Sequence, residues 1–191
     1  MTFARDIKIE RVDMGIDLLE ERNRANLEEQ TDVLRALPFG KIVACPEYPV
    51  QIQGITAADA FDAGDAFGTI TVVNVPKAGI LYSATFWDLD DEKTQVDLEV
   101  FRGTITQIAS DDAWELPVID LTKFVTEIAF AGFDDHIHCA TSEVNDIGKA
   151  YEAPGGMFYI QAVCRATPTI ASNGVRPYFQ LFIISFDPDW H

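Results

Sequence analysis

The sequence has few cysteines, no long apolar run and no apolar leader. Its 191 residues include three cysteines, Cys45, Cys139 and Cys164, and no CxxC pair, which argues against a disulfide framework. No stretch approaches 18 apolar residues, and the N-terminus MTFARDIKIERVD lacks the apolar segment of a signal peptide. We therefore expect no membrane partner and no secretion, and we expect Cys164, inside an apolar run, to be a small core residue.

Basic residues are also scarce. Lys and Arg total 14 against 31 Asp and Glu, which gives a net charge of -17. A polyanion such as DNA is repelled by such a field, so we expect no nucleic-acid partner. The apolar fraction of 48% and the charged fraction of 24% are those of a folded soluble domain.

Signatures of catalysis are missing as well. The sequence has no G-x-S-x-G elbow, no P-loop and no G-x-G-x-x-G turn. No Ser, His and Asp signature or activated cysteine supports nucleophilic chemistry. These absences predict a protein that is not an enzyme, with no catalytic residue, cofactor or metal ligand to assign.

Residues 1–40 differ from the rest of the chain and predict an N-terminal arm. A short extended segment near Ile7 is followed by a helix over residues 18–37, capped by Asp17 and stopped by Pro38. The apolar stripe of this helix is thin, so the helix either lies on its own domain or packs on a neighbouring copy. The second alternative predicts these protein-interface residues: Ile7, Ile9, Leu19, Leu27, Leu34 and Leu37.

Residues 41–191 carry the period of β-strands. Short alternating or β-branched runs are separated by turn signals, and no long helices alternate with them. This pattern predicts a mainly β fold, an antiparallel β-sandwich of jelly-roll type, with the helical arm in front of it. The predicted strands lie around residues 50–52, 66–73, 80–86, 96–101, 158–165 and 178–186, with Ile80, Tyr82, Ala84 and Phe86 sharing one face.

One cluster of residues could bind a metal. His136 and His138 are two apart, so on a strand they share a face and could chelate a metal with Asp134, as in cupin-like sites. Such sites need a nearby Glu and a distant third His. The candidates in this sequence are Glu143 for the first role and His191, at the end of the sequence, for the second. A solvated loop is the favoured alternative.

Two further groups have a functional and a plain interpretation. The acids of Asp88–Glu92 could bind calcium, but the EF-hand pattern is absent, and a hairpin turn with its acids in water is favoured. Trp87 and Trp114 could offer a sugar-binding platform, although aromatic residues in a sandwich are more often core. Trp87 follows the strand face that ends at Phe86, so we expect it to point to the opposite side.

The last two thirds of the chain resemble virion structural proteins of tailed bacteriophages. The resemblance rests on apolar strand and turn motifs, which carry packing rather than catalysis. These are Ala78–Ile80, Ala84–Glu92, Asp97–Phe101, Ala129–Phe133, Ile147–Gly148, Ala153–Gly156 and Tyr159–Thr167.

The resemblance implies a component of the virion that is assembled in the host cytoplasm. Its leading version is a capsid decoration (cement) protein, a homotrimer that binds the major capsid protein and stabilises the head shell. One alternative is a tail adaptor or a receptor- or glycan-binding module. Another is a cupin-like metal-dependent enzyme using His136 and His138.

Overall fold

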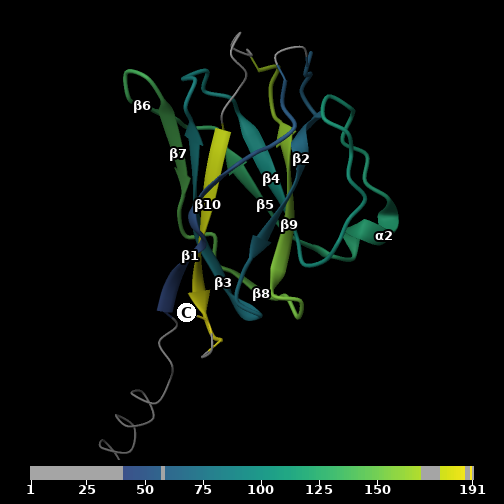
Figure 1. Ribbon diagram of the computed structural model, residues 1–191, viewed down its shortest axis with the longest axis vertical. Helices are drawn as coiled ribbons and strands as arrows, with labels where there is room; N and C mark the ends of the chain where they lie inside the picture. The colour runs from purple at the N-terminus through teal and green to yellow at the C-terminus, as the bar shows by residue number, and fades with distance from the viewer. Residues whose placement is uncertain (1–40, 57–58, 169–176, 188–189, 191) are drawn as a thin grey trace, which may run out of the picture. The chain divides into compact units, whose positions relative to one another are not determined.

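The computed structural model describes residues 41–56, 59–168, 177–187 and 190 (Figure 1). The predicted arm over residues 1–40 and all six of its interface residues lie outside this part of the chain. Residues 40–191 form one compact unit. The fold of that unit is mainly β and antiparallel, as the alternating sequence predicts.

Ten strands form two sheets that pack face to face (Figure 1). The six-stranded sheet has the order β1-β10-β3-β7-β6, with β8 also paired to β3. Its strands are β1 (Lys41–Gln51), β3 (Ala78–Asp88), β6 (Asp134–Asp135), β7 (Ala140–Val144), β8 (Lys149–Glu152) and β10 (Pro177–Ser185). The four-stranded sheet has the order β2-β9-β4-β5 and contains β2 (Ala66–Asn74), β4 (Val96–Phe101), β5 (Phe124–Phe130) and β9 (Met157–Cys164).

The chain alternates between the two sheets. From β1 to β4, and again from β8 to β10, each strand lies in the sheet opposite to its predecessor. This connectivity has the double Greek-key form of a jelly roll. It also corrects one expectation: the Asp88–Glu92 turn joins β3 to β4 in different sheets, so it is not a hairpin turn.

The core lies between the sheets and is rich in phenylalanine. Phe86 of β3 meets Phe130 of β5 with ring centroids 5.3 Å apart, which joins the two sheets directly. Phe158 and Phe179 are fully buried beside them. Cys164 is buried as predicted, and burial raises the pKa of its thiol to about 12, so it acts as a small apolar residue.

A bulge in β3 divides the face that the sequence predicts. Opposite β10, the register shifts between the pairs Phe182↔Ser83 and Ile183↔Leu81. A bulge inserts one extra residue into the strand. Beyond it, side chains that the simple alternation places on one face of the sheet therefore point to the other face. Ala84 and Phe86 therefore lie in the core as expected, whereas Leu81 replaces Ile80 and Tyr82 there.

The described residues include one short helix, α2 (Val118–Leu121). Asp120 is buried and anchors the preceding segment, because its carboxylate accepts the backbone N–H of Thr106 at 2.9 Å. No helix in the described ranges is long and apolar enough to cross a membrane.

Candidate functional site

One row of side chains crosses the outer face of the six-stranded sheet. In an antiparallel sheet, directly opposite residues project to the same face. The registers pair Gln51 with Tyr178, Tyr178 with Trp87, Trp87 with Thr141, and Thr141 with Asp134. We call these five residues the aromatic row. At ~4.8 Å between strands, the row is roughly 19 Å long.

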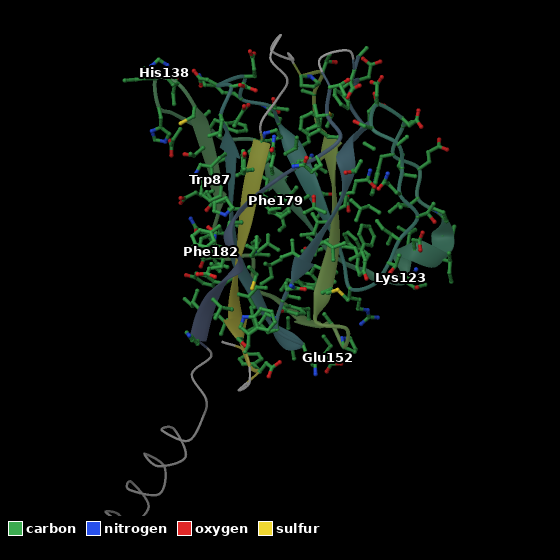
Figure 2. All side chains as sticks on the ribbon, in the orientation of Figure 1. Trp87, Lys123, His138, Glu152, Phe179 and Phe182 are labelled. Carbon is green, nitrogen blue, oxygen red and sulfur yellow. The ribbon has the colours of Figure 1, made fainter. Side chains whose placement is uncertain are left out.

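The row faces away from the core. Its neighbours Val50, Phe86 and Phe179 point inward, so Gln51, Trp87 and Tyr178 must point outward. Figure 2 shows Trp87 on the outer side of the sheet and Phe179 between the sheets. The predicted orientation of Trp87 is therefore confirmed.

The two rings of the row line an apolar shelf. Trp87 and Tyr178 form it together with Pro49 and Leu89, and its cavity volume is about 320 Å³. Leu89 is 42% exposed and both rings are partly exposed, so the shelf is open to solvent. A shelf of this kind offers flat apolar contact area next to water.

Polar groups lie at both ends of the rings. The Tyr178 hydroxyl lies 3.5 Å from Oε1 of Gln51, at the limit of a hydrogen bond. On the other side of Trp87, the Thr141 hydroxyl lies 3.0 Å from Nε2 of His136. Amide, hydroxyl, imidazole and carboxylate groups thus flank the two aromatic rings.

A second surface lies between the edge strands of the two sheets. Lys41–Ala44, Pro46, Glu47 and Val50 of β1 and Val72–Asn74 of β2 line a groove of about 580 Å³, together with Trp190. Ile42 is 55% exposed and Val72 is 51% exposed, so the groove has an apolar rim. We call it the edge groove.

Within the described residues, the histidine pair is not gathered with other ligands into a metal site. His136 and His138 lie in the loop between β6 and β7, and Ile137 between them has a φ of 60°, which breaks the extended geometry that a strand needs. His138 is exposed, and Glu143 is exposed on β7. No group of three or more His, Cys, Asp or Glu within the described part of the chain is placed to hold a metal ion.

The acidic turn after β3 has a structural role. Asp88 is fully buried, contrary to the expectation that these acids stay in water. Its carboxylate accepts the backbone N–H of Asp90 at 3.2 Å and that of Thr94 at 3.1 Å, which offsets the cost of burial. Side-chain oxygens of Asp90, Asp91 and Thr94 are buried without a hydrogen-bond partner among the described residues.

An acid with a strongly raised pKa, Glu99, lies on the outer face of the four-stranded sheet. Burial, together with the charges of Glu127 and Asp97, raises the pKa of Glu99 to about 7. Arg165 bonds to Asp97 and also to Glu127, at 2.5 Å. Arg165 therefore pairs with two of the three acids on this face.

Two further loop acids, Asp59 and Asp65, cap turns. Asp59 accepts the backbone N–H of Thr56 at 2.8 Å, and Asp65 accepts that of Asp62 at 2.7 Å. Such local bonds are the usual use of Asp in turns. The structure does not gather them into a carboxylate pair.

Sequence reasoning found Trp87 but missed the rest of the row. Tyr178 and Gln51 lie far from Trp87 in sequence, and only the strand register brings them together. Trp114 lies outside the row, and its backbone N–H donates to the carbonyl oxygen of Gly64. The alternation of β10 could have predicted the orientation of Tyr178. Because Tyr178 directly precedes the core residue Phe179, its side chain points to the opposite face.

Comparison with known proteins shows no family. No family model matches the chain, and no curated protein matches it. Among solved structures, the chain is similar to TmCBM61 in complex with beta-1,4-galactotriose, at 15% identity over 78% of this chain and 81% of that chain. The TM-score of this match is 0.23, which is too low to carry any conclusion about fold or ligand.

Proposed function

We propose that this protein is a non-enzymatic structural component of a phage particle, which binds other protein copies through the edge groove. Capsid decoration is the version we favour, in which copies of the chain associate and bridge the major capsid protein. The observation that carries the proposal is the edge groove itself, a channel with an apolar rim between the edge strands β1 and β2.

The free edges of β1 and β2 make this groove suited to an extended peptide. Within the described residues, β1 pairs only with β10 and β2 only with β9. The first part of β2 already bonds elsewhere, since Ala66 pairs with Asp111 and Asp112 and the N–H of Thr69 donates to the carbonyl of Gln53. Beside the groove, residues 41–44 and 72–74 keep an edge whose N–H and C=O groups another strand can use. Ile42 and Val72 add exposed apolar area on both sides of the channel.

We assign the groove to the segment around Ile7 and Ile9 of a neighbouring copy. These two residues alternate as strand residues do, so both can enter an apolar channel while Lys8 stays outside. Residues 1–12 hold three basic and two acidic side chains, a net charge of +1, whereas the chain as a whole carries -17. Repulsion between copies is therefore weakest for this segment.

The test places a charge in the groove and, separately, in the segment. Val72→Asp should dissociate the oligomer because a carboxylate in an apolar channel loses its hydration. Ile7→Asp combined with Ile9→Asp should have the same effect from the other side. Size-exclusion chromatography with light scattering gives the mass, and circular dichroism checks that each variant is folded.

The matched control is Val118→Asp, which makes the same change at a residue of α2 that is 81% exposed and outside the groove. This variant should keep the parent mass. A monomeric parent chain, or an oligomer that survives Val72→Asp, would contradict the proposal. Gold-labelled antibody on purified particles then distinguishes head from tail, and label at the tail alone would replace decoration by the tail-adaptor alternative.

A further inference from the structure

We infer that the aromatic row is a binding site for a neutral oligosaccharide. Trp87 and Tyr178 stack on the apolar faces of successive sugar rings, and the polar side chains of the row bind the hydroxyl groups. This site is separate from the edge groove and goes beyond the structural role proposed above.

The first argument for a sugar site is that the two aromatic residues lie side by side. Trp87 and Tyr178 are direct cross-strand partners, so their Cβ atoms lie about 5 Å apart on one face. Both rings are partly exposed and line the same shelf with Pro49 and Leu89. Stacking on exposed rings suits a sugar, because one face of a pyranose ring presents C–H groups and aromatic faces are weakly negative.

The second argument is that polar side chains lie at both ends of the row. Gln51 offers amide donors and an acceptor next to Tyr178, and Thr141 offers a hydroxyl next to Trp87. Asp134 at the end of the row is exposed and acts only as an acceptor. Sugar hydroxyls both donate and accept, so this mixed set matches them better than it matches a purely apolar ligand.

The geometry favours a chain of sugars over a single one. The row runs across five strands in one direction, over roughly 19 Å, with the two rings between its polar ends. A linear oligosaccharide laid across the strands meets every member in turn. The shelf is open to solvent, so it does not enclose a single sugar.

Local charge decides the class of sugar. Asp134 belongs to the row, and Glu143 is exposed two residues beyond Thr141 on the same strand face. Lys93 lies nearby but is paired with Asp135 at 2.7 Å. An acidic sugar would be repelled by these carboxylates and by the net charge of -17, so the ligand is uncharged.

The experiment uses the full chain and a defined set of probes. We would titrate it with the hexasaccharides of cellulose, β-1,4-galactan, amylose and chitin, and with hexagalacturonate as the acidic counterpart. Isothermal calorimetry should show binding to at least one neutral hexasaccharide at millimolar concentration or below. Hexagalacturonate should not bind.

Variants then locate the site. Trp87→Ala should weaken binding at least tenfold, whereas Trp87→Phe should retain part of it because a ring remains. Trp114→Ala is the matched control, since Trp114 is also partly exposed but lies outside the row, and its affinity should equal the parent's. Gln51→Ala and Thr141→Val should weaken binding less than Trp87→Ala.

Several results would overturn the inference. Failure of every neutral hexasaccharide to bind would do so, as would equal affinities for the parent and Trp87→Ala. A change of oligomeric mass in Trp87→Ala without sugar binding would show instead that the row is a protein interface. Val72→Asp should leave sugar affinity unchanged, so failure of the proposed assembly and failure of the sugar site can be told apart.

Discussion

The two outer faces of the sandwich differ in what the chain does with them. Outside the four-stranded sheet, residues 102–117 fold back over β9, as Figure 1 shows to the right of that strand. Gln161 of β9 is fully buried there, and its amide donates to the carbonyls of Gly68 at 2.9 Å and Ile108 at 2.7 Å. Outside the six-stranded sheet, the described residues leave the aromatic row uncovered.

The difference shows which polar groups are available for binding. On the covered face, the polar side chains bond to the chain itself: Gln161 holds the covering segment, and Arg165 joins Asp97 to Glu127. On the open face, large rings are exposed although burying them would stabilise the fold. We therefore expect mutations on the covered face to change stability and mutations on the open face to change binding.

Replacing Gln161 with Ala should have the largest effect on stability. The change leaves the buried carbonyls of Gly68 and Ile108 without their donor and creates a cavity. We expect a loss of about 2–4 kcal/mol in the free energy of unfolding, measured by urea denaturation. Gln53→Ala, at an exposed glutamine, is the control and should change stability by less than about 0.5 kcal/mol. An equal loss of unfolding free energy in both variants would contradict the proposed stabilising role of the covered face.

The pH dependence of stability tests the role of Glu99 on the covered face. Folding raises its pKa from the ordinary value of 4.5 to about 7, so between these pH values the folded chain binds more protons than the unfolded chain. Its contribution to stability therefore falls as pH rises through this window and stays unfavourable above pH 7. Glu99→Gln should stabilise the protein by about 1–3 kcal/mol at pH 8 and have almost no effect at pH 4.

The control for Glu99 is Glu152→Gln, at an exposed acid of β8 that Figure 2 labels at the lower end of the molecule. Thermal unfolding at both pH values, for both variants and the parent, gives the comparison. A pH-independent gain in Glu99→Gln would show that repacking, and not the buried charge, accounts for the effect.

The smallest effect on stability is expected on the open face. Trp87→Ala removes a partly exposed ring from the shelf and leaves no buried polar group unpaired. We expect a loss of about 1 kcal/mol or less in the free energy of unfolding, together with the loss of sugar binding. A larger loss than that of Gln161→Ala would mean that the row stabilises the fold, and the distinction between the faces would fail.

Sequence reasoning predicted most of β2, β3, β4, β9 and β10, reached only the last residues of β1, and missed β5, β6, β7 and β8. Alternation in residues such as Val96, Leu98 and Val100 predicts β4, and all three are buried in the core. The strands β6 and β8 have no such pattern, since Asp134–Asp135 and Lys149–Glu152 are short and polar. Their hydrogen-bond partners in β7 and β3 define them, and these partners are not local in sequence.

Local sequence by itself determined that residues 41–191 form a mainly β fold of sandwich type, because period-two patterns give each sheet an apolar face and the sequence offers no alternating long helices to cover it. It also determined that Trp87 points away from Phe86. The tertiary structure alone decided that β3 bulges, that Gln161 is covered, and that Trp87 stands beside Tyr178. The physical reason is register: side-chain direction within a strand follows from neighbouring residues, whereas the pairing of distant strands depends on the packing of the whole core.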